Sequence, residues 1–192
     1  PYSDTIVPKI SDAFVWDQKE TGRKLIYGEN TWNEAKAWVS DGNSFALMGD
    51  GTNAFIYKFY VNNLEAKNCY RISSSVATDV LSADFYAFSS TRSVLFYVKN
   101  NTLYAYNYDI GNERVDMIPL ETTDEITMLK FDLTMEPMKD ALYIATYSAI
   151  EGGSLRKYYV GNNPDKVELK SDPKAVWKGL TKVKNMSWRA LL

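Results

Sequence analysis

A repeated hairpin pattern constrains the fold of this chain more than any other feature of its sequence. Three apolar segments are each followed by a short turn and a second strand-like segment. The first segments are 44–48, 93–98 and 141–147, and the second segments are 53–60, 101–108 and 153–160. The turns between them hold Gly, Asn and Asp, which tolerate the positive φ that tight hairpins require. The repeat therefore predicts three antiparallel hairpins.

Two further strand candidates flank each hairpin. Those before it are 35–40, 84–88 and 126–133, and those after it are 69–73, 114–120 and 166–170. Segment 33–38 also carries a short helix signal, but the repeat favours a strand there. The result is three four-stranded units near 35–75, 80–121 and 126–171. Their period of roughly 45–50 residues is typical of β-propeller blades.

The apolar runs of these segments are unbroken, as in Val94-Leu95-Phe96-Tyr97-Val98. An antiparallel strand with one wet face alternates apolar and polar residues, so an unbroken run indicates burial on both faces. Blades stacked face to face around an axis meet this condition. A two-sheet sandwich is the second choice, because it would show cleaner alternation.

The two ends of the chain suggest how the blades are completed. Residues 13–28 predict one hairpin and residues 183–191 an isolated strand. Together they would form a shared fourth blade, which closes a single propeller-like domain over 1–192. Alternatively, the chain is the C-terminal part of a larger propeller. The lysine-rich segment 170–184 is interpreted as a solvated loop, and 134–139 as a connector.

Composition excludes several function classes. The chain has no histidine, which removes His-based triads and the usual zinc and copper ligands. Its single cysteine, Cys69, forms no internal disulfide. We therefore expect no cofactor and no metal site. The net charge of -2 gives no reason to bind nucleic acid, and the longest apolar runs are too short for a transmembrane segment.

Carboxylates are the remaining catalytic groups, and they lie at or near predicted strand ends. They are Asp17, Asp41, Asp50, Asp84, Asp132 and Glu151. No spacing among them selects a pair of the kind that a glycosidase needs. Turn carboxylates that accept backbone hydrogen bonds explain them better.

Five tryptophans are candidate stacking platforms for sugar rings: Trp16, Trp32, Trp38, Trp177 and Trp188. Trp16 and Trp188 fall within predicted strands, and we expect them to be largely buried. Trp32 lies in a connector, so it is the residue that we predict to bind a ligand.

Several strand phrases together resemble the PKD-like family of exported lipoproteins from gut anaerobes. They include Phe14-Val15-Trp16-Asp17, Asp84-Phe85-Tyr86-Ala87-Phe88-Ser89, Leu95-Phe96-Tyr97-Val98, Leu142-Tyr143-Ile144-Ala145-Thr146-Tyr147 and Trp177-Lys178-Gly179. The resemblance implies the C-terminal propeller region of an envelope protein. Such a protein would be outer-membrane-anchored or periplasmic, through an N-terminal lipid anchor that this chain lacks. The family supplies no catalytic residues to carry over.

The function that follows is a non-catalytic exported binding module, with a glycan or an envelope protein as its partner. One alternative is a carboxylate-dependent enzyme acting on polysaccharide. The other is a structural spacer that has no site. The two alternatives differ from the first hypothesis in what they require: two converging acids for the enzyme, and packed sheets alone for the spacer.

Overall fold

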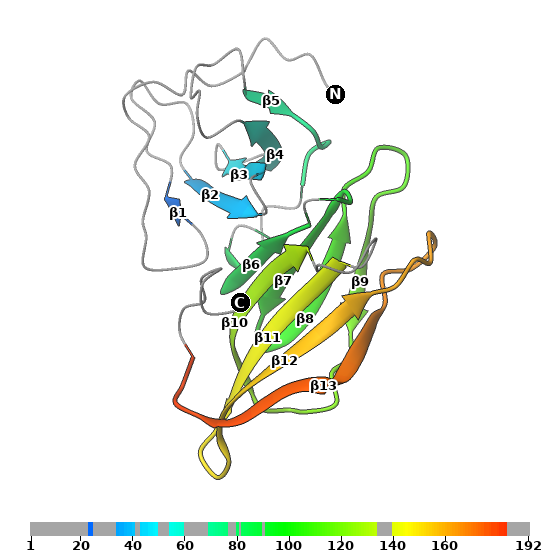
Figure 1. The fold of residues 1–192 in the computed structure, drawn as a ribbon. Helices are drawn as coiled ribbons and strands as arrows, with labels where there is room; N and C mark the ends of the chain where they lie inside the picture. The colour runs from blue at the N-terminus through cyan, green and yellow to red at the C-terminus, as the bar shows by residue number, and fades with distance from the viewer. Residues whose placement is uncertain are drawn as a thin grey trace.

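The computed structural model describes residues 23–24, 34–40, 43–49, 54–59, 69–76, 80, 82–89, 91–133 and 140–183. These residues form an all-β structure without an α-helix, and so contain no helix suited to crossing a bilayer. The strands build three antiparallel sheets, one after another along the chain (Figure 1). The predicted all-β class is confirmed.

The first sheet contains β1 (Arg23–Lys24), β2 (Glu34–Ser40), β3 (Asn43–Gly49), β4 (Ala54–Phe59) and β5 (Cys69–Arg71). The second sheet contains β6 (Phe85–Phe88), β7 (Val94–Lys99), β8 (Thr102–Asn107) and β9 (Arg114–Ile118). The third sheet contains β10 (Glu125–Leu133), β11 (Asp140–Ser148), β12 (Gly152–Val160) and β13 (Leu169–Leu180). Within each sheet, neighbours in space are neighbours in sequence.

These strands confirm the predicted hairpins and most of the predicted flanking strands. The ambiguous segment is a strand, because β2 pairs with β3 over its whole length, from Glu34 opposite Gly49 to Ser40 opposite Asn43. None of the three sheets closes on itself. Closure into a propeller therefore stays a prediction.

The prediction for the lysine-rich segment was wrong about its backbone. A strand was expected at 166–170 and a loop at 170–184, but β13 is one strand from Leu169 to Leu180. Its register with β12 shifts twice, and Pro173 lies in the stretch between Ser171 and Val176 where one shift occurs. Proline cannot donate to a ladder, so it is tolerated on an edge strand such as this one.

The N-terminal part of the predicted shared blade is described only at β1. β1 pairs with β2, Arg23 opposite Ala37 and Lys24 opposite Lys36, and so adds a fifth strand to the first sheet. The rest of the hairpin 13–28 and the C-terminal residues 184–191 lie outside the described residues, as does the connector 134–139. The shared fourth blade therefore stays a prediction.

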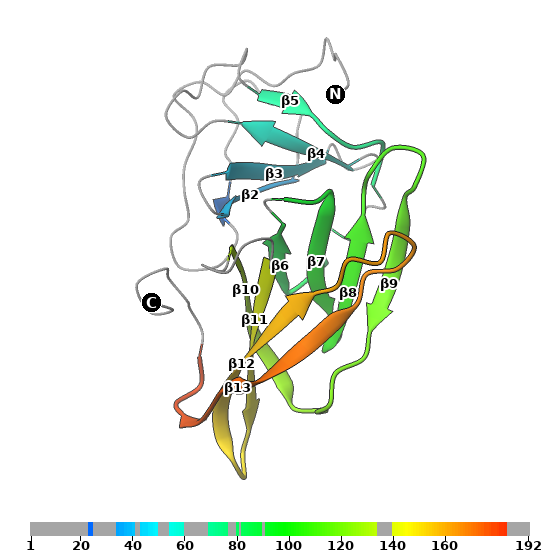
Figure 2. The same cartoon turned by 45° about the vertical axis from the view of Figure 1, so that its right-hand side comes forward.

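The second sheet contacts both of the other sheets, and its strand β7 is buried on both faces. On one face, Leu95 and Tyr97 join a core with Leu47 and Ile56 of the first sheet. On the other face, Val94, Phe96 and Val98 join a core with the third sheet. Figures 1 and 2 show the third sheet stacked on the second sheet, and the first sheet beyond one end of the second sheet. The predicted two-sided burial is confirmed in β7, whose first five residues are all buried.

The connection between the second and third sheets is held by one turn residue. Asn100 and Asn101 form the β7–β8 turn with φ of 51° and 57°, a conformation that Asn tolerates. The Asn101 side-chain amide donates to the carbonyls of Thr123 and Asp124, at 3.4 and 3.2 Å. Its Oδ1 accepts from the Ile126 N–H at 2.7 Å. The hairpin tip thus fixes where β10 begins.

We expect Phe96→Ala to destabilise the protein by about 3–5 kcal/mol, the usual cost of deleting a buried aromatic ring. Phe96 is fully buried and stacks on Phe131 of the third sheet, with ring centroids 6.4 Å apart. Urea denaturation measures the change, and Ile150→Ala is the control because Ile150 is 95% exposed. Equal stability of the two variants would contradict the stacking of the second and third sheets.

Candidate functional site

Of the ligand-binding residue and the carboxylates predicted from sequence, the structure describes only two with their side chains. Trp32 lies outside the described residues, as do Asp17, Asp41 and Asp50, and the side chain of Asp132 is not described. Asp84 and Glu151 are both exposed, but Asp84 precedes β6 and Glu151 lies in the β11–β12 turn of another sheet. Among the described residues, no cluster of acidic or cysteine side chains is suited to hold a metal ion.

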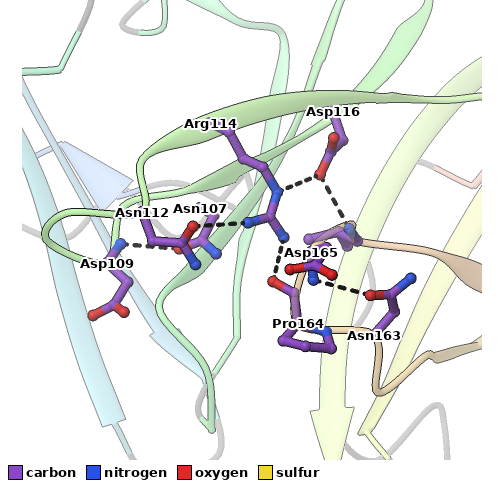
Figure 3. Close-up of polar contacts among 9 residues, drawn as sticks. Asn107, Asp109, Asn112, Arg114, Asp116, Asn163, Pro164 and Asp165 are labelled. Atoms are coloured by element: carbon purple, nitrogen blue, oxygen red, sulfur yellow. Dashed lines mark hydrogen bonds and ion pairs between the residues drawn. The ribbon is translucent and has the colours of Figure 1, made fainter.

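A polar junction joins the outer strand of the second sheet to the β12–β13 loop. Arg114 of β9 contacts the Asp116 carboxylate at 3.2 Å and donates to the Pro164 carbonyl at 3.0 Å and to Asn112 Oδ1 at 3.4 Å. The same Asp116 oxygen accepts from the Val167 N–H at 3.0 Å. Figure 3 shows the Arg114 guanidinium between β9 and this loop. We call these residues the Arg114 junction.

A second arginine holds the other end of the same loop. Arg92 donates to the Gly161 carbonyl at 2.5 Å and to Asn162 Oδ1 at 2.7 Å. Next to it, Thr91 donates to the carboxylate of Asp140, the first residue of β11. Arg92 and Arg114 therefore fix the β12–β13 loop, and with it the start of β13, to the second sheet.

A third polar group lies at the other end of this interface. Tyr158 donates to Glu121 Oε1 at 2.8 Å, and Arg156 Nε lies 3.6 Å from the same oxygen. Burial and the hydrogen bond to Glu121 raise the pKa of Tyr158 well above its ordinary value. In all three groups, charged side chains meet partners across the interface. Their observed role is to join sheets.

The aromatic residues best placed to meet a ligand lie on the face of the third sheet that is turned away from the second. Leu142 and Ile144 belong to the core shared with the second sheet, so Tyr143 between them points outward. Leu155 packs in the same outer cluster as Tyr143. Trp177 lies directly opposite Leu155, and cross-strand pairs share a face. Trp177 is therefore on the outer face.

Burial on this outer face decreases from β10, an edge strand that contacts β6 of the second sheet, to β13 at the opposite edge. Met128 of β10 and Ala145 of β11 are 2% and 0% exposed, and Leu155 of β12 is half-buried. Trp177 of β13 is 46% exposed. An exposed tryptophan on an edge strand leaves one large apolar ring available to solvent and to a ligand.

Neighbouring side chains hold the other aromatic rings of this face in place. The Tyr159 hydroxyl donates to Asp172 at 3.2 Å, and the Lys157 ammonium lies 4.8 Å from the Tyr159 ring centroid. The Lys182 ammonium lies 5.1 Å from the Tyr147 ring centroid. We call Tyr147, Lys157, Tyr159, Asp172 and Trp177 the β13 rim.

The rim forms an extended strip. Tyr147 lies opposite Gly153, and Tyr159 is six residues further along β12, a distance of roughly 20 Å along a strand. The end of β13 passes close to Gly153 of β12. Glycine is required at this position, because a Cβ there would overlap the carbonyl oxygens of Leu180 and Thr181. The strip is long enough to meet an extended ligand.

Trp177 is among the candidate stacking residues predicted from sequence, but Trp32 was selected as the ligand-binding residue, because Trp32 lies in a connector. The signal that would have found Trp177 is the apolar stretch Ala175-Val176-Trp177, which interrupts the lysines and favours a strand.

The fold places this chain in the all-β class, as stacked antiparallel sheets whose strands follow one another in sequence. Comparison with protein-family models and with curated proteins finds no match. The resemblance to the PKD-like family stays a prediction. The β13 rim and the polar groups between the sheets are therefore the features of the described residues that bear on function.

We expect Asp116→Ala to lower the free energy of unfolding by about 1–3 kcal/mol, because the half-buried Arg114 and the Val167 N–H lose their acceptor. Urea denaturation measures it. Asp109→Ala is the control, since its side chain is exposed and Figure 3 shows it pointing away from Arg114. A loss of the same size in both variants would contradict the structural role of the Arg114 junction.

We expect Tyr158→Phe to cost about 0.5–1.5 kcal/mol at neutral pH through loss of the hydrogen bond to Glu121. The folded-state pKa of Tyr158 is raised, so the unfolded chain deprotonates first as the pH passes about 10. The stability that the phenol contributes is therefore present below that pH and is lost above it. Urea denaturation of wild type and variant should give a difference that narrows from about pH 10 upward. A difference in the free energy of unfolding that does not change with pH would contradict the contribution assigned to the Tyr158 hydroxyl.

Proposed function

We propose that this chain is a non-catalytic binding module of an exported protein, and that it binds a glycan through the β13 rim. This proposal rests on the exposure of Trp177, whose side chain lies on the edge strand β13 and is 46% exposed. Aromatic faces pack on the apolar faces of sugar rings, and polar side chains beside them bind the hydroxyls. Lys157, Tyr159 and Asp172 supply such groups further along the β13 rim from Trp177, which lies opposite Leu155.

The non-catalytic role is supported by the contacts of Asp172, the acid of the β13 rim, and of Glu125 on β10. Asp172 accepts from the Tyr159 hydroxyl and from the Lys174 N–H, and Glu125 is paired with Lys182 at 2.9 Å. Glu125 lies opposite Tyr147, at the far end of the rim from Tyr159. Roughly 20 Å of strand separates those two ends, whereas a glycosidase needs carboxyl groups about 5–10 Å apart. The enzyme alternative is therefore less well supported.

A propeller-type arrangement is part of the same proposal. It is supported by three sheets that follow in chain order, by the stacking of the second sheet between its neighbours, and by the burial gradient of the third sheet. In a propeller the inner strands of each blade are covered and the outermost strand lies at the circumference. β13 would then present Trp177 on the outer surface of the ring. An exported, envelope-anchored location rests on the family resemblance.

We expect Trp177→Ala to weaken glycan binding by about tenfold or more, since a stacked ring contributes on the order of 1 kcal/mol or more beyond its buried area. A glycan array identifies the ligand, and calorimetric titration measures the affinity. Met117→Ala is the matched control, because Met117 is 61% exposed on β9 of another sheet. Trp32→Ala tests the residue predicted from sequence.

The outcomes separate the hypotheses. Loss of binding in the Trp177 variant alone supports the β13 rim, and loss in the Trp32 variant alone moves the site to that residue. Absence of binding across the whole array contradicts the glycan proposal. It leaves an envelope-protein partner or a structural spacer, which a pull-down with the full-length protein distinguishes.

A further inference from the structure

The edge strand that carries Trp177 is strongly basic in a chain that is slightly acidic. Residues 169–183 contain the four lysines Lys170, Lys174, Lys178 and Lys182, all exposed, and a single acid, Asp172. The whole chain has a net charge of -2. Lys182 is paired with Glu125, and the charges of Lys170, Lys174 and Lys178 lie along one edge of the third sheet, next to the β13 rim.

The positions of these lysines follow the rim. Lys170 lies opposite Tyr159, which places it on the outer face. Lys174 belongs to the stretch between Ser171 and Val176, where the register shifts and the strand bulges. Lys178 follows Trp177 in the stretch between Trp177 and Leu180, where the register shifts again. Cationic groups are therefore distributed along the length of the edge strand that borders the β13 rim.

Lysines on an edge strand have a second physical role, because they prevent pairing with strands of other molecules. Charge alone therefore assigns no ligand. The exposed ring of Trp177 is an independent observation, because solvation of an edge does not require a large apolar side chain there. A ligand that presents both an apolar ring face and negative charge satisfies both features.

We propose that the ligand of the β13 rim is an acidic polysaccharide, whose carboxylate or sulfate groups contact the lysines while a sugar ring stacks on Trp177. This inference rests on the proposed glycan-binding function and names its substrate class. Exposed ion pairs are individually weak and are screened by salt. Several of them along an extended polymer would add to one stacking contact and would distinguish charged from neutral chains.

The test compares two forms of one polymer, polygalacturonic acid and its methyl-esterified form, which differ in charge and share a backbone. Calorimetric titration of the whole chain should show tighter binding of the acidic form, weakening as salt is added. The double variant Lys174→Gln/Lys178→Gln should weaken binding of the acidic form by about tenfold. It should leave the esterified form unaffected. Lys166→Gln is the control, since Lys166 is exposed in the β12–β13 loop outside β13.

Each outcome decides the proposal. Equal, Trp177-dependent binding of both polymer forms overturns the acidic-ligand inference and leaves the proposed function standing. Binding of neither form, together with an empty glycan array, overturns both. Oligo(dT) that binds as tightly as polygalacturonic acid, and competes with it, overturns the polysaccharide assignment in favour of single-stranded nucleic acid. The lysines that are replaced by glutamine are exposed, so the variants should keep the midpoint temperature of thermal denaturation of the wild type.

Discussion

The structure depends on the burial of both faces of the second sheet. Neither face of β7 is a polar face that could be exposed to solvent, so each face must be covered by another sheet. Leu95 and Tyr97 pack toward the first sheet, and Phe96 and Val98 pack toward the third. One short strand thereby imposes a stack of three sheets. A two-sheet sandwich would cover only one of its faces.

Apolar stacking is non-directional, so the polar contacts at the sheet ends are needed to set the position of one sheet on the next. Asn101 fixes the start of β10. Arg92 and Arg114 fix the two ends of the β12–β13 loop. Each uses backbone carbonyls or amides as partners, whose positions are set by the main chain. The charged groups between the sheets are therefore explained by geometry, and a catalytic explanation is not needed for them.

Most of the fold could be predicted because periodicity and turn chemistry are local signals. The hairpins and the strand at Glu34–Ser40 follow from them, and so does the two-sided burial of Val94–Val98. β13 could not be predicted in the same way. Pro173 and the lysines indicate a loop locally, and the strand forms because β12 offers a free edge and Gly153 allows close approach. For the same reason Trp177 could not be selected from the five candidate tryptophans, since its exposure depends on tertiary pairing.

The edge position of β13 also explains why a binding surface would be found there. Side chains of β10 and β11, such as Met128 and Ala145, are buried, and β10, although an edge strand, contacts β6 of the second sheet. β13 is the opposite edge strand, so it tolerates proline, register shifts and exposed side chains at little cost to the core. Substitution of Trp177 or the lysines would therefore leave the stack of sheets unchanged. In the proposed binding module, stability is determined by the second sheet and its neighbours, and specificity by β13.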